Sequence, residues 1–320
     1  MNQLIALKMR WVSFSMFLEK ILKTCSKQYL LRSFAFKVLL PVFFVSTFAV
    51  VSFFLVFTLP LSQPAAAANN SHYLFLPYIT RNASTKSFWR PTPGTSWQIQ
   101  FSSQIDTSLD VQVYDLDMVD TPTSIIDQLH TDGHKVMCYF SAGSWEQWRS
   151  DADDFPDSVL GDDMDVWPGE KWLDIRRLDL LGPIMSARLD TAAQKNCDGV
   201  DPDNVDGYNN STGFNLSYQD QIAYNTWLAD QAHALGLAIG LKNDLDQIAD
   251  LLPYFDWALN EQCFQYNECD LLLPFVTANK PVFGIEYNSD TSSFCPLANQ
   301  MNFDFLKKNW DLDAWRIACR

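Results

Sequence analysis

Histidine is scarce in this 320-residue chain, and one common catalytic motif is missing. The four histidines, at positions 72, 130, 134 and 233, form no zinc-ligand motif. No Gly-x-Ser-x-Gly sequence is present, so serine-hydrolase chemistry has no support. There is no internal repeat, and the only low-complexity tract is a run of four alanines at 65–68. We expect neither a metal nor a cofactor.

Basic residues are also scarce after residue 37. The whole chain has 23 Lys and Arg against 38 Asp and Glu, a formal charge of −15. Seven of the basic residues lie in residues 1–37 beside a single acid, Glu19, which leaves a net charge of −21 on the remainder. A body with this charge repels phosphate, which argues against nucleic acid as a partner, and it attracts cationic ligands.

Residues 38–59 form an uncharged apolar run, long enough to cross a bilayer at about 20 residues per span. The basic segment before it stays inside, so the body is expected to be secreted or extracellular. The alanine run at 65–68 resembles a signal-peptidase site. A cleaved signal peptide and a retained membrane anchor both fit. We divide the chain into this N-terminal region (1–68), a linker (69–87) and one catalytic domain (88–320).

The distribution of the seven cysteines agrees with export, because an even number in an exported domain suggests disulfides. Cys25 precedes the apolar run, and an even number, six, follow it. Cys263 and Cys269 are close enough to close a single loop, and Cys295 with Cys319 is the next plausible pair. Cys138 lies inside an apolar strand, where a buried free thiol, a common state of cysteine, is the alternative to a disulfide.

The hydrophobic pattern alternates between short strand-like runs and helix-like stretches. Eight strands separated by helices predict an α/β fold, a (β/α)8 TIM-type barrel, which uses about 250 residues as one domain. A doubly wound sheet is the alternative, but Phe101-Ser102-Ser103-Gln104 follows the first strand where a glycine-rich phosphate loop belongs. The expected strands are 97–102, 111–117, 135–141, 199–203, 238–243, 256–261, 281–287 and 314–318. The expected helices are 123–132, 174–195, 218–235, 244–252, 270–279 and 297–308.

Polar residues gather near the carboxyl ends of these strands, where barrel enzymes carry their reactive groups. The first strand contributes Gln98 and Gln100. On the fourth strand the period of two places Asp201 and Asp203 on one face. Strand ends also meet water, but the concentration of acids at one rim favours a ligand site. The candidate substrate-binding residues are Asp115, Asp117, Tyr139, Ser141, Asp201, Lys242, Asn243, Glu286 and Tyr287.

The acid-rich stretch from Asp201 to Gly207 resembles a calcium-binding loop, but the spacing is wrong. Its third acid and its glycine come one position late, and Thr212 stands where a bidentate glutamate is needed. Lys242 is a possible Schiff-base nucleophile, although a lysine beside so many carboxylates is more simply an ion-pair partner or a donor to a hydroxyl. The chemistry that remains is a pair of carboxylates on different strands, the minimum for glycoside hydrolysis.

Several blocks in the right order resemble the glycoside hydrolase family 114 domain, the endo-α-1,4-polygalactosaminidases. The blocks begin at Tyr139, Trp172, Gly199 and Asn260 and read YFSAGS, WLDIR, GVDPDNVDGY and NEQCF. The resemblance covers about residues 88–319 and leaves the N-terminal 87 residues unexplained. It implies a (β/α)8 barrel that cuts α-1,4-linked galactosamine polymers.

The family's two catalytic carboxylates correspond to Asp203 and Glu261. By analogy with other α-retaining barrels, Asp203 is expected to be the nucleophile and Glu261 the general acid/base. Trp145, Trp148 and Trp172 are candidates for stacking on sugars or for packing. We expect a monomer whose partner is a cationic amino-sugar polysaccharide. Two alternatives stay open, namely a carbohydrate-binding barrel without turnover and a hydrolase of another α-linked galacto-configured glycan.

Overall fold

The computed structural model describes residues 88–320. The apolar run at 38–59 and the alanine run lie outside the described residues. Within the described part, no helix combines the length and the apolar character that a membrane crossing requires.

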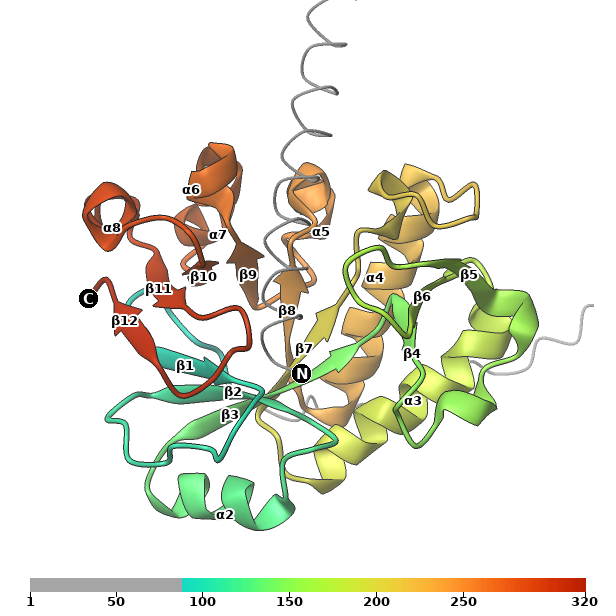
Figure 1. Ribbon diagram of the computed structural model, residues 1–320, viewed down its shortest axis with the longest axis horizontal. Helices are drawn as coiled ribbons and strands as arrows, with labels where there is room; N and C mark the ends of the chain where they lie inside the picture. The colour runs from blue at the N-terminus through green and yellow to red at the C-terminus, as the bar shows by residue number, and fades with distance from the viewer. Residues whose placement is uncertain (1–87) are drawn as a thin grey trace, which may run out of the picture. The chain divides into compact units, whose positions relative to one another are not determined.

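Eight parallel strands form a barrel-like sheet in the order β1-β2-β3-β7-β8-β9-β10-β11 (Figure 1). This arrangement confirms the α/β barrel predicted from the alternating pattern. The first connection, 101–112, holds turns and no helix, and a long third connection carries a separate small sheet. The strands are β1 Trp97–Gln100, β2 Val113–Asp117, β3 Lys135–Ser141, β7 Gly199–Asp203, β8 Ala238–Lys242, β9 Trp257–Glu261, β10 Val282–Glu286 and β11 Asp304–Lys308.

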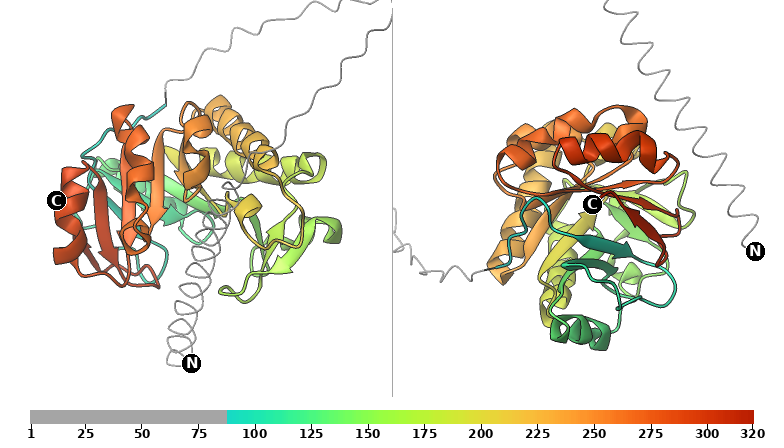
Figure 2. Two further views of the ribbon diagram at one scale, coloured as in Figure 1. Left: turned by 90° about the horizontal axis from the view of Figure 1, so that it is seen from above. Right: turned by 90° about the vertical axis from the view of Figure 1, so that its left-hand side faces the viewer.

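The first and last strands of the barrel lie side by side (Figure 2). The Trp97 indole N–H donates to the carbonyl of Asp304 at 2.8 Å. A short strand, β12 (Arg316–Ala318), pairs antiparallel with β11, and Arg316 donates to the carbonyl of Trp97. The seam between β1 and β11 is therefore closed by side chains and by β12 rather than by a continuous strand ladder.

Alternation along the strands produces two apolar clusters. Residues on one face, such as Ile99, Val113 and Phe283, fill the barrel interior, and those on the other face pack beneath the helices. The outer cluster includes Ile126 and Leu129, the buried face of the first helix. The helices are α2 Thr123–Thr131, α3 Leu178–Gln194, α4 Tyr218–Leu235, α5 Ile248–Leu251, α6 Cys263–Tyr266, α7 Leu273–Thr277 and α8 Thr291–Gln300.

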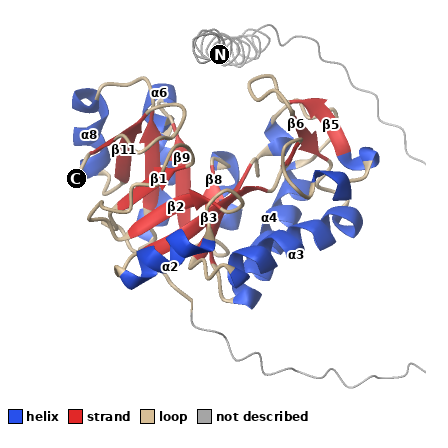
Figure 3. Cartoon of the chain, turned by 60° about the horizontal axis from the view of Figure 1, so that its bottom comes forward, coloured by secondary structure: helices blue, strands red, loops and turns tan. Residues whose placement is uncertain are grey.

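The third connection forms a three-stranded antiparallel sheet beside the barrel (Figure 3). Its strands are β4 Ser144–Glu146, β5 Leu160–Asp163 and β6 Glu170–Leu173, in the order β4-β6-β5. The Leu173 N–H donates to the carbonyl of Gly143 at 3.0 Å, so the two ends of the insertion meet. This sheet begins three residues after the end of β3, on the rim where the predicted site lies.

The prediction was wrong at the C-terminal end of the chain. The expected helix at 297–308 ends early, because α8 stops at Gln300 and Asn302 adopts a left-handed backbone (φ 61°). Residues 304–308 instead form β11, the eighth barrel strand. The run at 314–318, expected to be that strand, contains the short antiparallel β12.

Three disulfides join the six cysteines of the described residues. The expected pairs Cys263–Cys269 and Cys295–Cys319 are present. Cys138 is bonded to Cys197, so the free-thiol interpretation of Cys138 was wrong. This third bridge links β3 to the residue two before β7, because β3 and β7 are neighbours in the barrel.

Candidate active site

Lys242, at the end of β8, lies among three carboxylates. Its ammonium nitrogen is 3.3 Å from Asp203 Oδ1, 3.6 Å from Glu261 Oε2 and 3.7 Å from Asp201 Oδ2. The Lys242 side chain is 3% exposed and that of Asp201 is 0% exposed, whereas those of Asp203 and Glu261 are 20% and 26% exposed. Only Asp203 and Glu261 are therefore within reach of a ligand from solvent.

A tyrosine hydroxyl donates to each of these two reachable carboxylates. Tyr139 donates to Asp203 Oδ2 at 3.2 Å, and Tyr287 donates to Glu261 Oε1. Each tyrosine ring also packs on a second aromatic ring. Phe101 lies against Tyr139, with ring centroids 4.4 Å apart. Trp310 stacks on Tyr287 at 4.1 Å.

Two asparagines with left-handed backbones fix the ends of β7 and β8. Asn204 (φ 61°) follows Asp203, and its N–H donates to Asp203 Oδ1 at 2.8 Å. Asn243 (φ 56°) follows Lys242, and its amide donates to Glu261 Oε2 at 3.1 Å while its Oδ1 accepts from the Glu261 N–H. Asparagine tolerates this conformation better than most residues, which explains its use at both positions.

The electrostatics of the cluster favour charged Lys242 and charged Glu261. Burial by itself lowers the pKa of Lys242, but the carboxylates of Asp203, Glu261, Asp201 and Asp115 outweigh it, and the pKa lies well above its ordinary value. Burial raises the pKa of Glu261, and the opposing effects of Lys242, Tyr287 and Asn243 bring it below its ordinary value.

Asp201 and Asp115 lie beneath the reachable pair and are fully buried. None of their carboxyl oxygens has a hydrogen-bond partner. Burial, partly offset by Lys242, raises the pKa of Asp201 to about 7. Burial and the charge of Asp201 raise the pKa of Asp115 well above its ordinary value. These two acids therefore retain protons at a pH where Glu261 is ionised.

Three of the predicted substrate-binding residues are engaged elsewhere. Asp117 accepts two hydrogen bonds from Arg149, at 3.1 and 2.7 Å. Ser141 shares a hydrogen bond with the Ser144 hydroxyl at 2.6 Å. Glu286 accepts from the backbone N–H groups of Phe264 and Gln265 at the start of α6. The predicted residues that the structure does gather around Lys242 are Asp115, Tyr139, Asp201, Asp203, Asn243, Glu261 and Tyr287.

The structure adds residues that the sequence analysis did not consider for this site. Glu146 and Glu170 come from the inserted sheet. Burial raises the pKa of the nearby Tyr139, and the charges of Asp203, Glu146 and Glu170 add to this effect. Trp310 follows β11, the strand that the prediction misplaced. No local motif marked any of them. Of the three tryptophans considered, Trp148 is 55% exposed, whereas Trp172 is buried and the indole N–H of Trp145 donates to Ala152.

The geometry fits acid/base and nucleophilic chemistry at a sugar. The two distances from Lys242 give the gap between Asp203 Oδ1 and Glu261 Oε2 an upper bound of about 7 Å. This bound admits the roughly 5–5.5 Å separation of retaining glycosidases and the short end of the roughly 6.5–9.5 Å range of inverting ones. In the described residues, no group of three or more His, Cys, Asp or Glu side chains is arranged to hold a metal.

Solved structures similar to this chain include two glycoside hydrolases. Ega3 of Aspergillus fumigatus, crystallised in complex with galactosamine, is 45% identical to this chain, with a TM-score of 0.70 over 73% of this chain and 99% of Ega3. The glycoside hydrolase domain of PelA from Pseudomonas aeruginosa is 11% identical, with a TM-score of 0.57 over 70% of this chain and 98% of that domain, and shares the fold. No curated protein sequence matches.

The similarity to Ega3 and the match to a family model identify the chain as a glycoside hydrolase. The model of glycoside-hydrolase family GH114 matches residues 79–320. The chain belongs to this family, as the sequence blocks indicated.

Proposed function

We propose that this protein is an exported endo-acting hydrolase of α-1,4-linked galactosamine polymers, with Asp203 and Glu261 as its catalytic pair. The observation that carries the proposal is the position of these two carboxylates, the reachable acids on either side of the buried Lys242. The galactosamine complex of Ega3 supports the choice of sugar. The three disulfides and the net charge of −21 beyond residue 37 agree with an extracellular enzyme for a cationic polymer.

In the proposed mechanism Asp203 attacks the anomeric carbon, and the bond to the leaving chain breaks as Glu261 gives its proton to the glycosidic oxygen. A glycosyl ester on Asp203 results. Water then attacks the same carbon and transfers a proton to Glu261, which releases the sugar and restores both carboxyl groups. The Tyr139 hydroxyl and the N–H of Asn204 hold the two oxygens of Asp203 during the attack.

The resting state sets a condition on this mechanism. Lys242, Tyr287 and Asn243 favour the ionised form of Glu261, although a general acid must carry a proton when the leaving group departs. A bound polymer excludes water from Glu261, which favours its neutral form. We therefore expect productive binding to include uptake of a proton by Glu261.

Substitution of the two carboxylates tests the proposal. Asp203→Asn and Glu261→Gln should each lower kcat by at least about a thousandfold, because each group acts in the transition state. Asp163→Asn is the matched control, since Asp163 lies on β5 with an 81% exposed side chain, and it should keep full activity. The assay is reducing-end release from partly deacetylated galactosaminogalactan by residues 69–320.

Normal turnover by either variant would refute the assignment of the pair. Tight binding of the polymer by the wild-type protein without any cleavage would instead favour a carbohydrate-binding barrel.

A further inference from the structure

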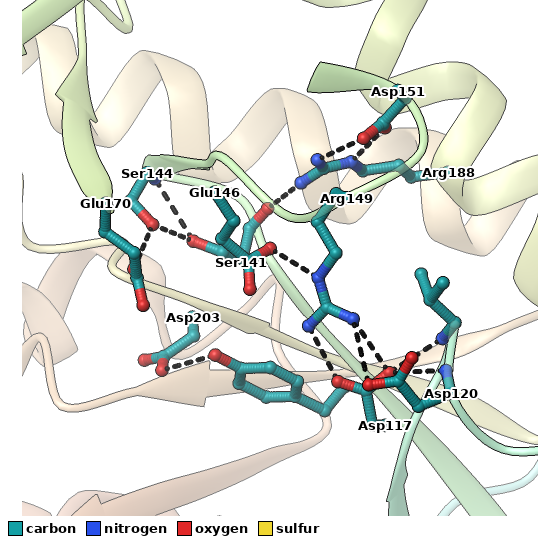
Figure 4. A network of polar contacts seen from close by, with 12 residues as sticks. Asp117, Asp120, Ser141, Ser144, Glu146, Arg149, Asp151, Glu170, Arg188 and Asp203 are labelled. Atoms are coloured by element: carbon teal, nitrogen blue, oxygen red, sulfur yellow. Dashed lines mark hydrogen bonds and ion pairs between the residues drawn. The ribbon is translucent and has the colours of Figure 1, made fainter. Parts of the chain in front are cut away.

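Glu170 is a second acidic group beside Asp203, on the side formed by the inserted sheet. It is 7% exposed, and its Oε2 accepts a hydrogen bond from the Ser144 hydroxyl at 2.8 Å. Within residues 88–320 no donor is recorded for its other oxygen, Oε1, and this atom is not among the fully enclosed ones. Figure 4 shows the carboxyl groups of Glu170 and Asp203 turned toward the same space.

The neighbouring cations of the described chain are paired with other acids. Arg149 donates to Glu146 at 2.9 Å and holds Asp117 with two bonds. Lys171, the next residue along β6, reaches Asp163 at 2.5 Å. No ion pair is recorded for Glu170 in this part of the chain, and the cation that serves Asp203 is Lys242. Among the described residues, Asp203 therefore has a lysine partner, whereas Glu170 has none.

The protonation of Glu170 agrees with a missing counter-ion. Burial, together with the charges of Glu146 and Asp203, raises the pKa of Glu170 to about 7 against the opposing effects of Ser144 and Arg149. A cation placed between Glu170 and Asp203 would favour the ionised carboxylate and release a proton from it.

The chemistry of an amino sugar provides such a cation in the required position. When Asp203 lies within reach of the anomeric carbon, the substituent on the adjacent C2 lies a few Å from the same carboxylate. In galactosamine that substituent is an ammonium group, whereas in N-acetylgalactosamine it is a neutral amide. Of the two glutamates that act on Tyr139 from the inserted sheet, Glu146 is paired with Arg149, whereas Glu170 has no recorded ion pair within the described part of the chain.

We infer that Glu170 is a specificity-determining residue that receives the 2-ammonium group of the sugar bound at Asp203, and that it selects deacetylated over N-acetylated units. This inference rests on the proposed function. It goes beyond it by assigning the choice between the two sugars to one side chain of the insertion.

Binding of single sugars tests the inference without requiring turnover. Titration calorimetry should show that Glu170→Gln weakens galactosamine about ten- to a hundredfold, the effect of removing a charge-assisted contact. Galactose and N-acetylgalactosamine should bind the variant and the wild-type protein within about twofold of each other. Asp163→Asn, on the same small sheet, should change none of the three.

A measurement on the unmodified protein covers the case in which Glu170→Gln does not fold. At about pH 6.5, in buffers of different ionisation enthalpy, galactosamine binding should release up to about one proton more than N-acetylgalactosamine binding, because any proton uptake by Glu261 is common to the two sugars. Equal proton exchange for both sugars would overturn the inference.

The outcomes separate this inference from the proposed function. Galactosamine binding that depends on Glu170, in a protein that cuts no polymer, would keep the inference and refute the hydrolase. Cleavage of deacetylated polymer with an unchanged preference in Glu170→Gln would keep the hydrolase and refute the inference. Wild-type protein that binds galactosamine no better than galactose would also refute the inference.

Discussion

Replacement of Lys242 by methionine should destabilise the protein in a manner that depends strongly on pH. The Lys242 side chain is only 3% exposed, and it forms ion pairs with Asp201, Asp203 and Glu261. Removal of one partner from a buried ion pair costs about 3–5 kcal/mol of unfolding free energy. For a domain of this size each kcal/mol shifts the Tm by about 2–4 °C, so we expect a loss of roughly 6–20 °C near neutral pH.

The sign of the pH dependence follows from the two kinds of group. Lys242 has a raised pKa, so its stabilisation is complete below the ordinary lysine pKa and is lost only as the pH rises through the folded value. Glu261 has a lowered pKa, so its contribution is present above the ordinary glutamate value and is lost as the pH falls through the folded one. Asp201, with a pKa of about 7, favours unfolding increasingly as the pH rises from about 4 to 7.

Without Lys242 the carboxylates lose their counter-ion where they are ionised, and they need none where they are protonated. The Tm difference between Lys242→Met and wild type should therefore be smaller at about pH 4 than at about pH 8. Lys171→Met is the control, because its partner Asp163 is exposed and such surface pairs contribute about 0–1 kcal/mol. Differential scanning calorimetry measures both. An equal Tm difference at the two pH values would refute the electrostatic reasoning.

Three further predictions concern the tyrosine, the disulfides and the surface charge. Tyr287→Phe removes a donor that favours ionised Glu261, so the pKa of this general acid should rise and the alkaline limb of the pH profile of kcat/KM should move to higher pH, with about a tenfold loss of activity. An unmoved alkaline limb would contradict the role of this hydrogen bond. Replacing Cys138 and Cys197 by alanine should lower the free energy of unfolding by about 4 kcal/mol, and replacing Cys263 and Cys269 should lower it by about 2 kcal/mol, because the bridged residues are 59 and 6 positions apart. Urea unfolding that gives the reverse order would exclude this account. For deacetylated polymer kcat/KM should fall about tenfold from low to high salt, and any activity on N-acetylated polymer should stay nearly constant; equal salt dependence would assign the acidity to solubility.

The sequence predicted the residues around Lys242 because strand ends follow local rules. Seven of the eight barrel strands were placed correctly, and their period of two identifies the inward side chains. The same period explains why Glu286 lies outside the site. Ile285 and Tyr287 belong to the interior cluster, and Glu286, between them, points to the other face. Closer use of strand parity would have separated Glu286 from the candidate site.

Other features depend on contacts that are distant in the sequence. β11 has the sequence DFLKK, whose charged ends resemble a continuation of α8, and only pairing with β10 makes it a strand. Cys138 and Cys197 meet because β3 and β7 are neighbours across a long insertion. Glu170 faces the same space as Asp203 from that insertion (Figure 4), where neither periodicity nor a motif marks it.

The hydrogen bond between Leu173 and Gly143 makes the inserted sheet an exchangeable module. Its two ends meet at one point of the barrel rim, and its three strands pair with one another rather than with the barrel. A segment with adjoining ends can be replaced without altering the spacing of the flanking strands. Grafting the corresponding insertion from another barrel hydrolase between these residues would alter the wall beside Asp203 and leave Lys242 and Glu261 in place. On the inference drawn for Glu170 and the proposed catalytic pair, sugar selectivity lies in the insertion and bond cleavage in the barrel, which offers a direct route to redesigned glycan-cutting enzymes.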